Sequence, residues 1–121
     1  MSMWQVALGG AVGASLRYGV NMLAARALAG WPAATLAVNV LGSFAMGVLV
    51  VALAQRGQAA VPFLLTGLLG GFTTFSAFSL DTLVLWERGD HLAAGIYVAA
   101  SVGLSLAAII AGLAVARGFY A

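Results

Sequence analysis

Long apolar stretches separated by short polar connectors are the main pattern of this sequence. Charged residues are absent from 27–55 and from 92–116, and Asp81 is the one charged residue within 59–86. An α-helix needs about 20 apolar residues to cross the hydrocarbon of a bilayer. The pattern therefore predicts four membrane-spanning helices, over residues 4–27, 32–54, 61–86 and 92–116.

Composition supports the same conclusion. The 121 residues are 64% hydrophobic and 7% charged, with a mean hydropathy of +1.10, whereas a soluble domain is about 25% charged. So few polar side chains cannot cover a soluble protein, which excludes a soluble enzyme, a disordered chain and a nucleic-acid binder. The sequence contains no cysteine, so it offers no disulfide framework and no thiolate metal site. We expect one all-α domain over residues 1–121, crossing the inner (plasma) membrane several times.

The arginines give this chain no preferred orientation. With four spans, Arg56 and Arg117 lie on one side of the membrane, and Arg26 and Arg88 lie on the other. Since positive charge sets orientation, either the insertion machinery resolves a weak bias or both orientations are made. A chain inserted both ways can pair with itself as an antiparallel two-fold dimer, and two-fold dimers are the commonest oligomers. A single four-helix bundle is also too thin to surround a hydrated pore easily.

The third predicted span has the least regular sequence. Residues 59–86 would extend about 42 Å as one continuous helix, roughly 12 Å more than the hydrocarbon thickness. Tilt or a local break would absorb the excess. Gly70-Gly71, followed closely by Thr73-Thr74, is poor helix-forming sequence. A break at this depth exposes carbonyls that can hold a cation and N–H groups that can meet an anion, and we expect one near the middle of the helix.

Polar residues form two stripes at helical spacing inside the apolar spans. The second span carries Thr35, Asn39 and Ser43, and the fourth carries Tyr97, Ser101 and Ser105. Asn39 either bonds a neighbouring helix or donates hydrogen bonds to an anion on a pathway. The hydroxyls of the fourth span either bond back to their own helix or form a ladder for a small polar species.

A charged side chain and a run of aromatic rings inside the spans are also open to two interpretations. Arg17 lies within the first span, where a charge costs about 2.5–3.5 kcal/mol on insertion scales. It either extends toward the membrane surface or makes a watery cavity electropositive. Phe72, Phe75 and Phe78 recur every three residues. They either pack against a neighbouring helix or present positive ring edges to a small anion.

At these residues the sequence resembles the Fluc family of fluoride channels, also known as fluoride exporters. The resemblance spans essentially the whole chain. It is carried, in order, by Gly9–Tyr18, Thr35–Phe44, Gly70–Ser79 and the Tyr97, Ser101, Ser105 stripe. It implies a dual-topology antiparallel homodimer of four-span chains, each with a broken third helix, and two parallel fluoride pathways.

The resemblance also implies roles for individual residues. A structural Na⁺ at the dimer interface would be held by the backbone carbonyls of Gly70 and Thr73. The residues that match the family's fluoride pathway are Arg17, Thr35, Asn39, Phe75, Phe78, Tyr97, Ser101 and Ser105. Asp81 stands where some relatives have a glutamate, whose carboxylate reaches farther.

The function that the resemblance implies is passive export of F⁻ across the cytoplasmic membrane. This export relieves fluoride toxicity and involves no catalysed reaction. The expected partners are a second copy of the chain, the fluoride ion and the lipid bilayer. One alternative is a small multidrug-type, proton-coupled exporter, but this needs a membrane carboxylate early in the first span, and residues 9–16 contain none. A non-transporting packing subunit of a larger complex explains the glycines and alanines but not the polar stripes beside a broken helix.

Overall fold

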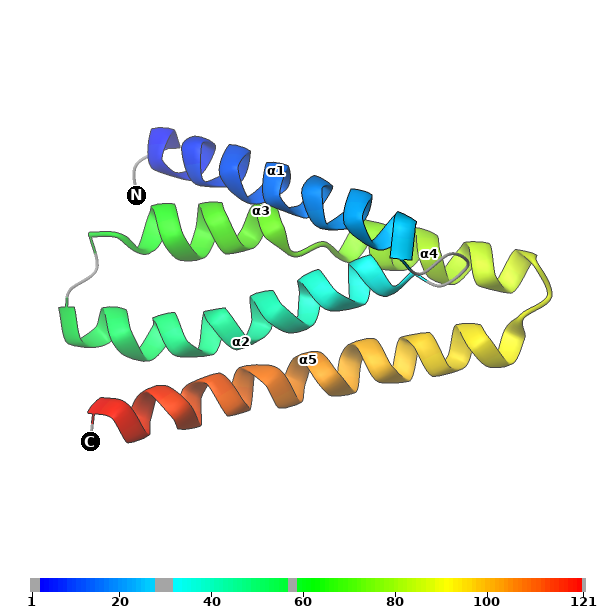
Figure 1. The fold of residues 1–121 in the computed structure, drawn as a ribbon. Helices are drawn as coiled ribbons and strands as arrows, with labels where there is room; N and C mark the ends of the chain where they lie inside the picture. Colours follow the sequence, from blue (N-terminus) through cyan, green and yellow to red (C-terminus); the bar gives the residue numbers. More distant parts are fainter. Residues whose placement is uncertain (1–2, 28–31, 57–58, 121) are drawn as a thin grey trace.

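The described part of the chain folds as four helical segments that run side by side, each antiparallel to the one before it, and the third of them, Pro62–Glu87, is divided into three elements (Figure 1). The computed structural model describes residues 3–27, 32–56 and 59–120, and no strand occurs within these ranges. The elements are α1 (Met3–Ala27), α2 (Ala33–Arg56), the π-helix η1 (Pro62–Leu69), α3 (Gly70–Phe72), α4 (Phe75–Glu87) and α5 (His91–Tyr120). Both ends of the chain lie at the same end of the molecule (Figure 1).

Three helical segments in the described part of the chain are long and apolar enough to cross a membrane: Ala33–Ala54, Pro62–Glu87 and His91–Tyr120. They correspond to the second, third and fourth predicted spans, although α5 continues past the expected end at residue 116. The helix α1 matches the first predicted span, 4–27, to within one residue at its start. Polar side chains such as Arg17 and Asn21 lower its hydropathy, and its crossing of the membrane stays a prediction.

The connectors 28–31 and 57–58 lie outside the described residues, as do the side chains of Arg26 and Arg56. The equal division of arginines between the two ends is therefore an observation on the sequence alone.

The third predicted span is interrupted, as expected from its sequence. Thr73 (φ −83°, ψ 158°) and Thr74 (φ −153°, ψ 128°) are extended, which ends the helical winding that begins at Pro62. The hydroxyl of Thr74 then accepts a hydrogen bond from the N–H of Ala77 (3.1 Å) and caps α4, as threonine commonly does at a helix start. The break lies at the two threonines, because Gly70 and Gly71 remain helical.

Glycines allow the helices to approach one another at backbone distance. A Cβ atom added to Gly13 of α1 would overlap the carbonyl oxygen of Leu68 in η1. A Cβ added to Gly112 of α5 would likewise overlap the carbonyl oxygen of Phe44 in α2. Small residues spaced four apart predict such contacts in membrane helices, and here they join α1 to the broken span and α2 to α5.

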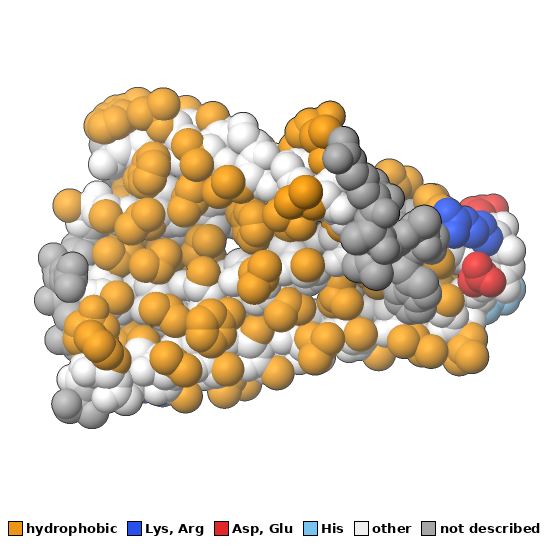
Figure 2. Space-filling model, in the orientation of Figure 1, with side chains coloured by type: hydrophobic (Ala, Val, Ile, Leu, Met, Phe, Trp, Pro, Cys, Tyr) orange, Lys and Arg blue, Asp and Glu red, His pale blue; other side chains and the backbone are white. Residues whose placement is uncertain are grey.

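Few side chains are buried within one copy of the chain. The buried apolar residues among those described are Val38, Leu53, Leu69, Leu85, Ala94, Tyr97 and Ala116. Hydrophobic side chains cover most of the face seen in Figure 2, and charged ones gather at the end where α4 turns into α5. Soluble monomers rarely expose apolar patches larger than a few hundred Å². This surface is therefore suited to contact with lipid or with another chain.

Candidate functional site

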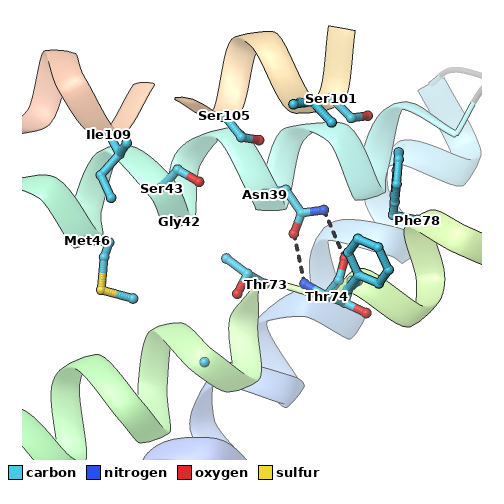
Figure 3. Close-up of a pocket in the computed structure, with 13 residues that line it drawn as sticks. Asn39, Gly42, Ser43, Met46, Thr73, Thr74, Phe78, Ser101, Ser105 and Ile109 are labelled. Atoms are coloured by element: carbon cyan, nitrogen blue, oxygen red, sulfur yellow. Dashed lines mark hydrogen bonds between the residues drawn. The ribbon is translucent and has the colours of Figure 1, made fainter. Parts of the chain in front are cut away.

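A pocket of about 530 Å³ opens between α2, α5 and the broken segment (Figure 3). Seven residues of the predicted fluoride pathway and Na⁺ site line it: Asn39, Gly70, Thr73, Phe75, Phe78, Ser101 and Ser105. Its other lining residues are Gly42, Ser43, Met46, Thr74, Val102 and Ile109. The pocket thus joins parts of both predicted polar stripes to the break in the third span. Arg17, Thr35 and Tyr97 are not among its lining residues.

Asn39 connects α2 to the extended backbone of the break (Figure 3). Its Nδ2 donates to the carbonyl oxygen of Thr74 (3.0 Å), and its Oδ1 accepts from the N–H of the same residue (2.8 Å). The Asn39 amide therefore bonds both the N–H and the carbonyl of Thr74, the residue at which the helix is broken. The interhelical interpretation of Asn39 is confirmed, and its place in the pocket lining is compatible with further contact through its second amide hydrogen.

The side chains of Asn39 and Thr74 accept the N–H groups that would bond the carbonyls of Gly70 and Thr73 in a continuous helix. In a continuous helix these carbonyls would accept from the N–H groups of Thr74 and Ala77. Here Thr74 donates to Asn39 Oδ1, and Ala77 donates to Thr74 Oγ1. Carbonyls in unwound membrane segments are typical Na⁺ ligands. These two carbonyl oxygens fit the Na⁺ that the resemblance implies at Gly70 and Thr73.

Arg17 contacts the broken segment from α1, whereas Asn39 contacts it from α2. Its Nε donates to the carbonyl oxygen of Gly71 (3.2 Å), and the side chain is half-buried. The helical donor to that carbonyl would be the N–H of Phe75, which lies beyond the break. A guanidinium has five N–H donors, so this bond leaves others to act on the surroundings. Arg17 thus lies beside the break but outside the pocket.

The polar stripe of α5 divides into residues that line the pocket and one that does not. Ser101 and Ser105 line it. The hydroxyl oxygen of Ser101 is buried and, within the described part of the chain, makes no hydrogen bond of good geometry, although it lies close enough to the Tyr97 hydroxyl to interact with it. Since it does not bond back to its own helix, the first of the two interpretations is wrong for Ser101. Tyr97 is fully buried, and its hydroxyl donates to Asp81 Oδ2 (3.1 Å).

The two pocket phenylalanines adjoin one another on α4. The ring centroids of Phe75 and Phe78 lie 5.5 Å apart at an interplanar angle of 55°. Phe78 also contacts the ring of Tyr97, with centroids 5.4 Å apart. Phe75 is 78% exposed in a single copy of the chain, so it depends on lipid or on another chain for cover. A tilted pair of this kind exposes ring edges as well as faces.

Sequence reasoning missed two contributors to the site. Thr74 caps α4 and presents both of its backbone groups to Asn39. A threonine placed just before a run of helical residues is a recognisable cap signal. Gly42 provides the space in which the Thr73 methyl group packs, because a Cβ at Gly42 would overlap it. Nothing in the sequence alone identifies that contact.

Comparison with known proteins identifies relatives along nearly the whole chain. Residues 4–113 match the family described as CrcB-like protein, Camphor Resistance (CrcB). The chain is 63% identical over 118 residues to a fluoride-specific ion channel FluC of Paracoccus denitrificans, covering 97% of this chain and 95% of that protein. It is 58% identical over 121 residues to a FluC of Cereibacter sphaeroides, covering 99% and 98%. It is 57% identical over 116 residues to a FluC of Rhizobium etli, covering 93% of each.

Proposed function

The chain belongs to the CrcB-like family, and from that membership we propose that it is a fluoride-selective channel that exports F⁻ passively across the cell membrane. It is a multi-pass membrane protein and not an enzyme. The observation on the structure that best supports this function is the buried, unpartnered hydroxyl of Ser101 in the lining of a pocket that also contains Phe78 and Asn39. A buried donor without an acceptor is costly, and a small anion that accepts hydrogen bonds removes this cost.

The pathway that we propose replaces the hydration shell of fluoride with uncharged dipoles. Ser101 and Ser105 supply hydroxyl donors, Asn39 supplies an amide N–H, and Phe75 and Phe78 supply ring edges. Selectivity follows from pore width and lining groups, and we propose that the assembled pore is narrow and dry enough at these groups to favour the smallest halide. Arg17 and Thr35 are assigned to the approaches, where the cation raises the local concentration of anions.

The functional unit that we propose is an antiparallel dual-topology homodimer of four-span chains. Its support is the exposure of Phe75, which lines the pocket yet is mostly uncovered in one copy. The proposed Na⁺ at the interface binds the carbonyls of Gly70 and Thr73, whose helical donors are engaged elsewhere. When bound, this ion supplies positive potential beside the anion pathway.

Fluoride efflux from liposomes tests the proposal directly. Purified protein in vesicles loaded with potassium fluoride is expected to release F⁻ rapidly when a K⁺ ionophore is added, as measured with a fluoride electrode. Phe75→Ile and Phe78→Ile are each expected to abolish this flux, because an aliphatic side chain lacks the positive ring edge. Phe119→Ile is the control, since Phe119 is 81% exposed on the last turn of α5 and does not line the pocket.

Three outcomes would contradict this proposal. Efflux no faster than from empty vesicles would reject the channel function. Unchanged flux in both Phe75→Ile and Phe78→Ile, with the dimer intact, would reject the role of the ring edges. Flux that required a proton gradient would instead favour the exporter alternative.

The Na⁺ site predicts a stability effect of a specific cation. A ligand that binds only the folded state raises stability with its concentration. The melting temperature of the detergent-solubilised protein is therefore expected to rise and then saturate with added Na⁺. N-methylglucamine at the same ionic strength is the control. An identical rise with both cations would indicate a general salt effect and no Na⁺ site.

A further inference from the structure

An aspartate outside the pocket is connected to a pocket ring through two direct contacts. Asp81 Oδ2 accepts the hydroxyl proton of Tyr97 at 3.1 Å, and this bond joins α4 to α5. The ring of Tyr97 lies 5.4 Å from that of Phe78, at an interplanar angle of 36°. Phe78 lines the pocket, whereas Asp81 and Tyr97 do not. Asp81 and Phe78 are three residues apart on α4 and therefore share a face of the helix.

The hydroxyl proton of Tyr97 is already engaged in this arrangement. Its side chain is 0% exposed and belongs to a core cluster with Leu85 and Ala94, against which Phe78 packs. A phenol has a single proton to donate, and here that proton is directed at Asp81. Of the stripe on α5, Ser101 is thus the first hydroxyl that can donate into the pocket.

We propose that Asp81 is a positioning residue: it holds the Tyr97 hydroxyl, and the Tyr97 ring in turn sets the orientation of Phe78 at the pocket. The inference rests on the proposed function, in which the edge of the Phe78 ring meets fluoride. It assigns the carboxylate a role as hydrogen-bond acceptor and not as a charge within the anion path. The two roles differ in what they predict for a neutral side chain that still accepts a hydrogen bond.

Fluoride efflux in a double-mutant cycle tests this role. Asp81→Ala and Tyr97→Phe are each expected to lower the flux about tenfold, since each removes the same hydrogen bond, made to an ionisable group. The double variant is expected to lie within about twofold of either single variant, because the two residues act through one interaction. Asp81→Asn keeps an oxygen acceptor and is expected to restore flux to within about twofold of the unmodified channel.

Other results of the same experiment would overturn the positioning role of Asp81. Effects that multiply in the double variant would overturn the proposal, as would unchanged flux in Asp81→Ala. Flux in Asp81→Asn well above that of the unmodified channel would identify Asp81 as a charge that repels the anion. Failure of Asp81→Asn to rescue, with normal dimer content, would likewise overturn the acceptor role.

A spectroscopic measurement tests the same contact without conduction. 4-Fluorophenylalanine incorporated at position 78 is expected to give a ¹⁹F resonance that shifts or broadens in Tyr97→Phe and Asp81→Ala, and returns in Asp81→Asn. The same label at position 119, on the last turn of α5, is expected to be unaffected. An unchanged signal from position 78 would overturn the proposal even if fluoride flux changed. If the unmodified protein conducted no fluoride, the function would fail while the label still reported on the contact.

Discussion

Asn39→Ala is expected to reduce fluoride efflux by at least about a hundredfold and to lower the stability of the protein. The substitution leaves the N–H and the carbonyl of Thr74 without the partners they have on α2. Each group left unsatisfied costs about 1–3 kcal/mol of folding stability. The pathway also loses the amide that donates to the anion and the support of the break, and a loss of about 2.8 kcal/mol at the barrier corresponds to a hundredfold fall in rate. Liposome efflux gives the first quantity, and thermal unfolding in detergent gives the second.

Two further variants separate the structural from the conductive role of Asn39. Asn39→Asp keeps an acceptor for the Thr74 N–H but loses the donor to its carbonyl and adds a negative charge. A carboxylate at this position meets the Thr74 carbonyl oxygen and places a charge inside a span, so this variant should not conduct even where it retains the bond to the Thr74 N–H. Asn21→Ala is the control, because it removes an amide from α1 at a residue that does not line the pocket. Flux in Asn39→Ala equal to that of the unmodified protein would show that the break does not depend on this side chain.

Gly112→Ala is expected to destabilise the fold more than the same change at any other glycine of α5, since a Cβ at Gly95, Gly103 or Gly118 meets nothing within 4 Å. The new Cβ would overlap the carbonyl oxygen of Phe44 and lie 3.1 Å from the nitrogen of Val48, both in the backbone of α2. Backbone cannot move aside as a side chain does, and overpacking of this kind costs about 1–3 kcal/mol or more. The expected result is a lower melting temperature and a smaller fraction of folded protein after extraction.

Gly103→Ala is the matched control on the same helix. A Cβ at Gly103 meets nothing within 4 Å, and alanine favours a helix over glycine by about 1 kcal/mol. This variant should be as stable as the unmodified protein or slightly more so. If both alanines behaved alike, close packing of α2 on α5 would not be what holds the pair together.

The sequence predicts the helices well because their lengths follow from a local property, the extent of each apolar stretch. The break was also predictable, since adjacent glycines and threonines form helix poorly. Its location differs in detail: Gly70 and Gly71 stay helical, and Thr73 and Thr74 unwind. The reason is non-local, because the extended backbone of Thr74 is stabilised by Asn39, which lies 35 residues earlier in the chain.

The site likewise combines features that follow from local sequence and features that depend on contacts between helices. Spacing indicated that Asn39, Ser101 and Ser105 each lie on a polar stripe, and the structure brings all three to one pocket. The spacing of residues along the sequence could not indicate which hydrogen bonds they make. The bond of Tyr97 to Asp81 and that of Arg17 to Gly71 join residues on different helices. Such contacts depend on how the helices pack, which no periodicity encodes.

The unwound turn at Thr73 and Thr74 also constrains the order in which the chain assembles. Backbone polar groups have no partners in hydrocarbon, so an isolated segment in lipid must keep its own helical hydrogen bonds. The turn completes its bonds on Asn39 of α2, and the adjoining Gly71 carbonyl is bonded by Arg17 of α1. We therefore expect the third segment to enter the bilayer as a continuous helix. We expect it to unwind only after the two preceding helices are in place, so that the break forms late in biogenesis.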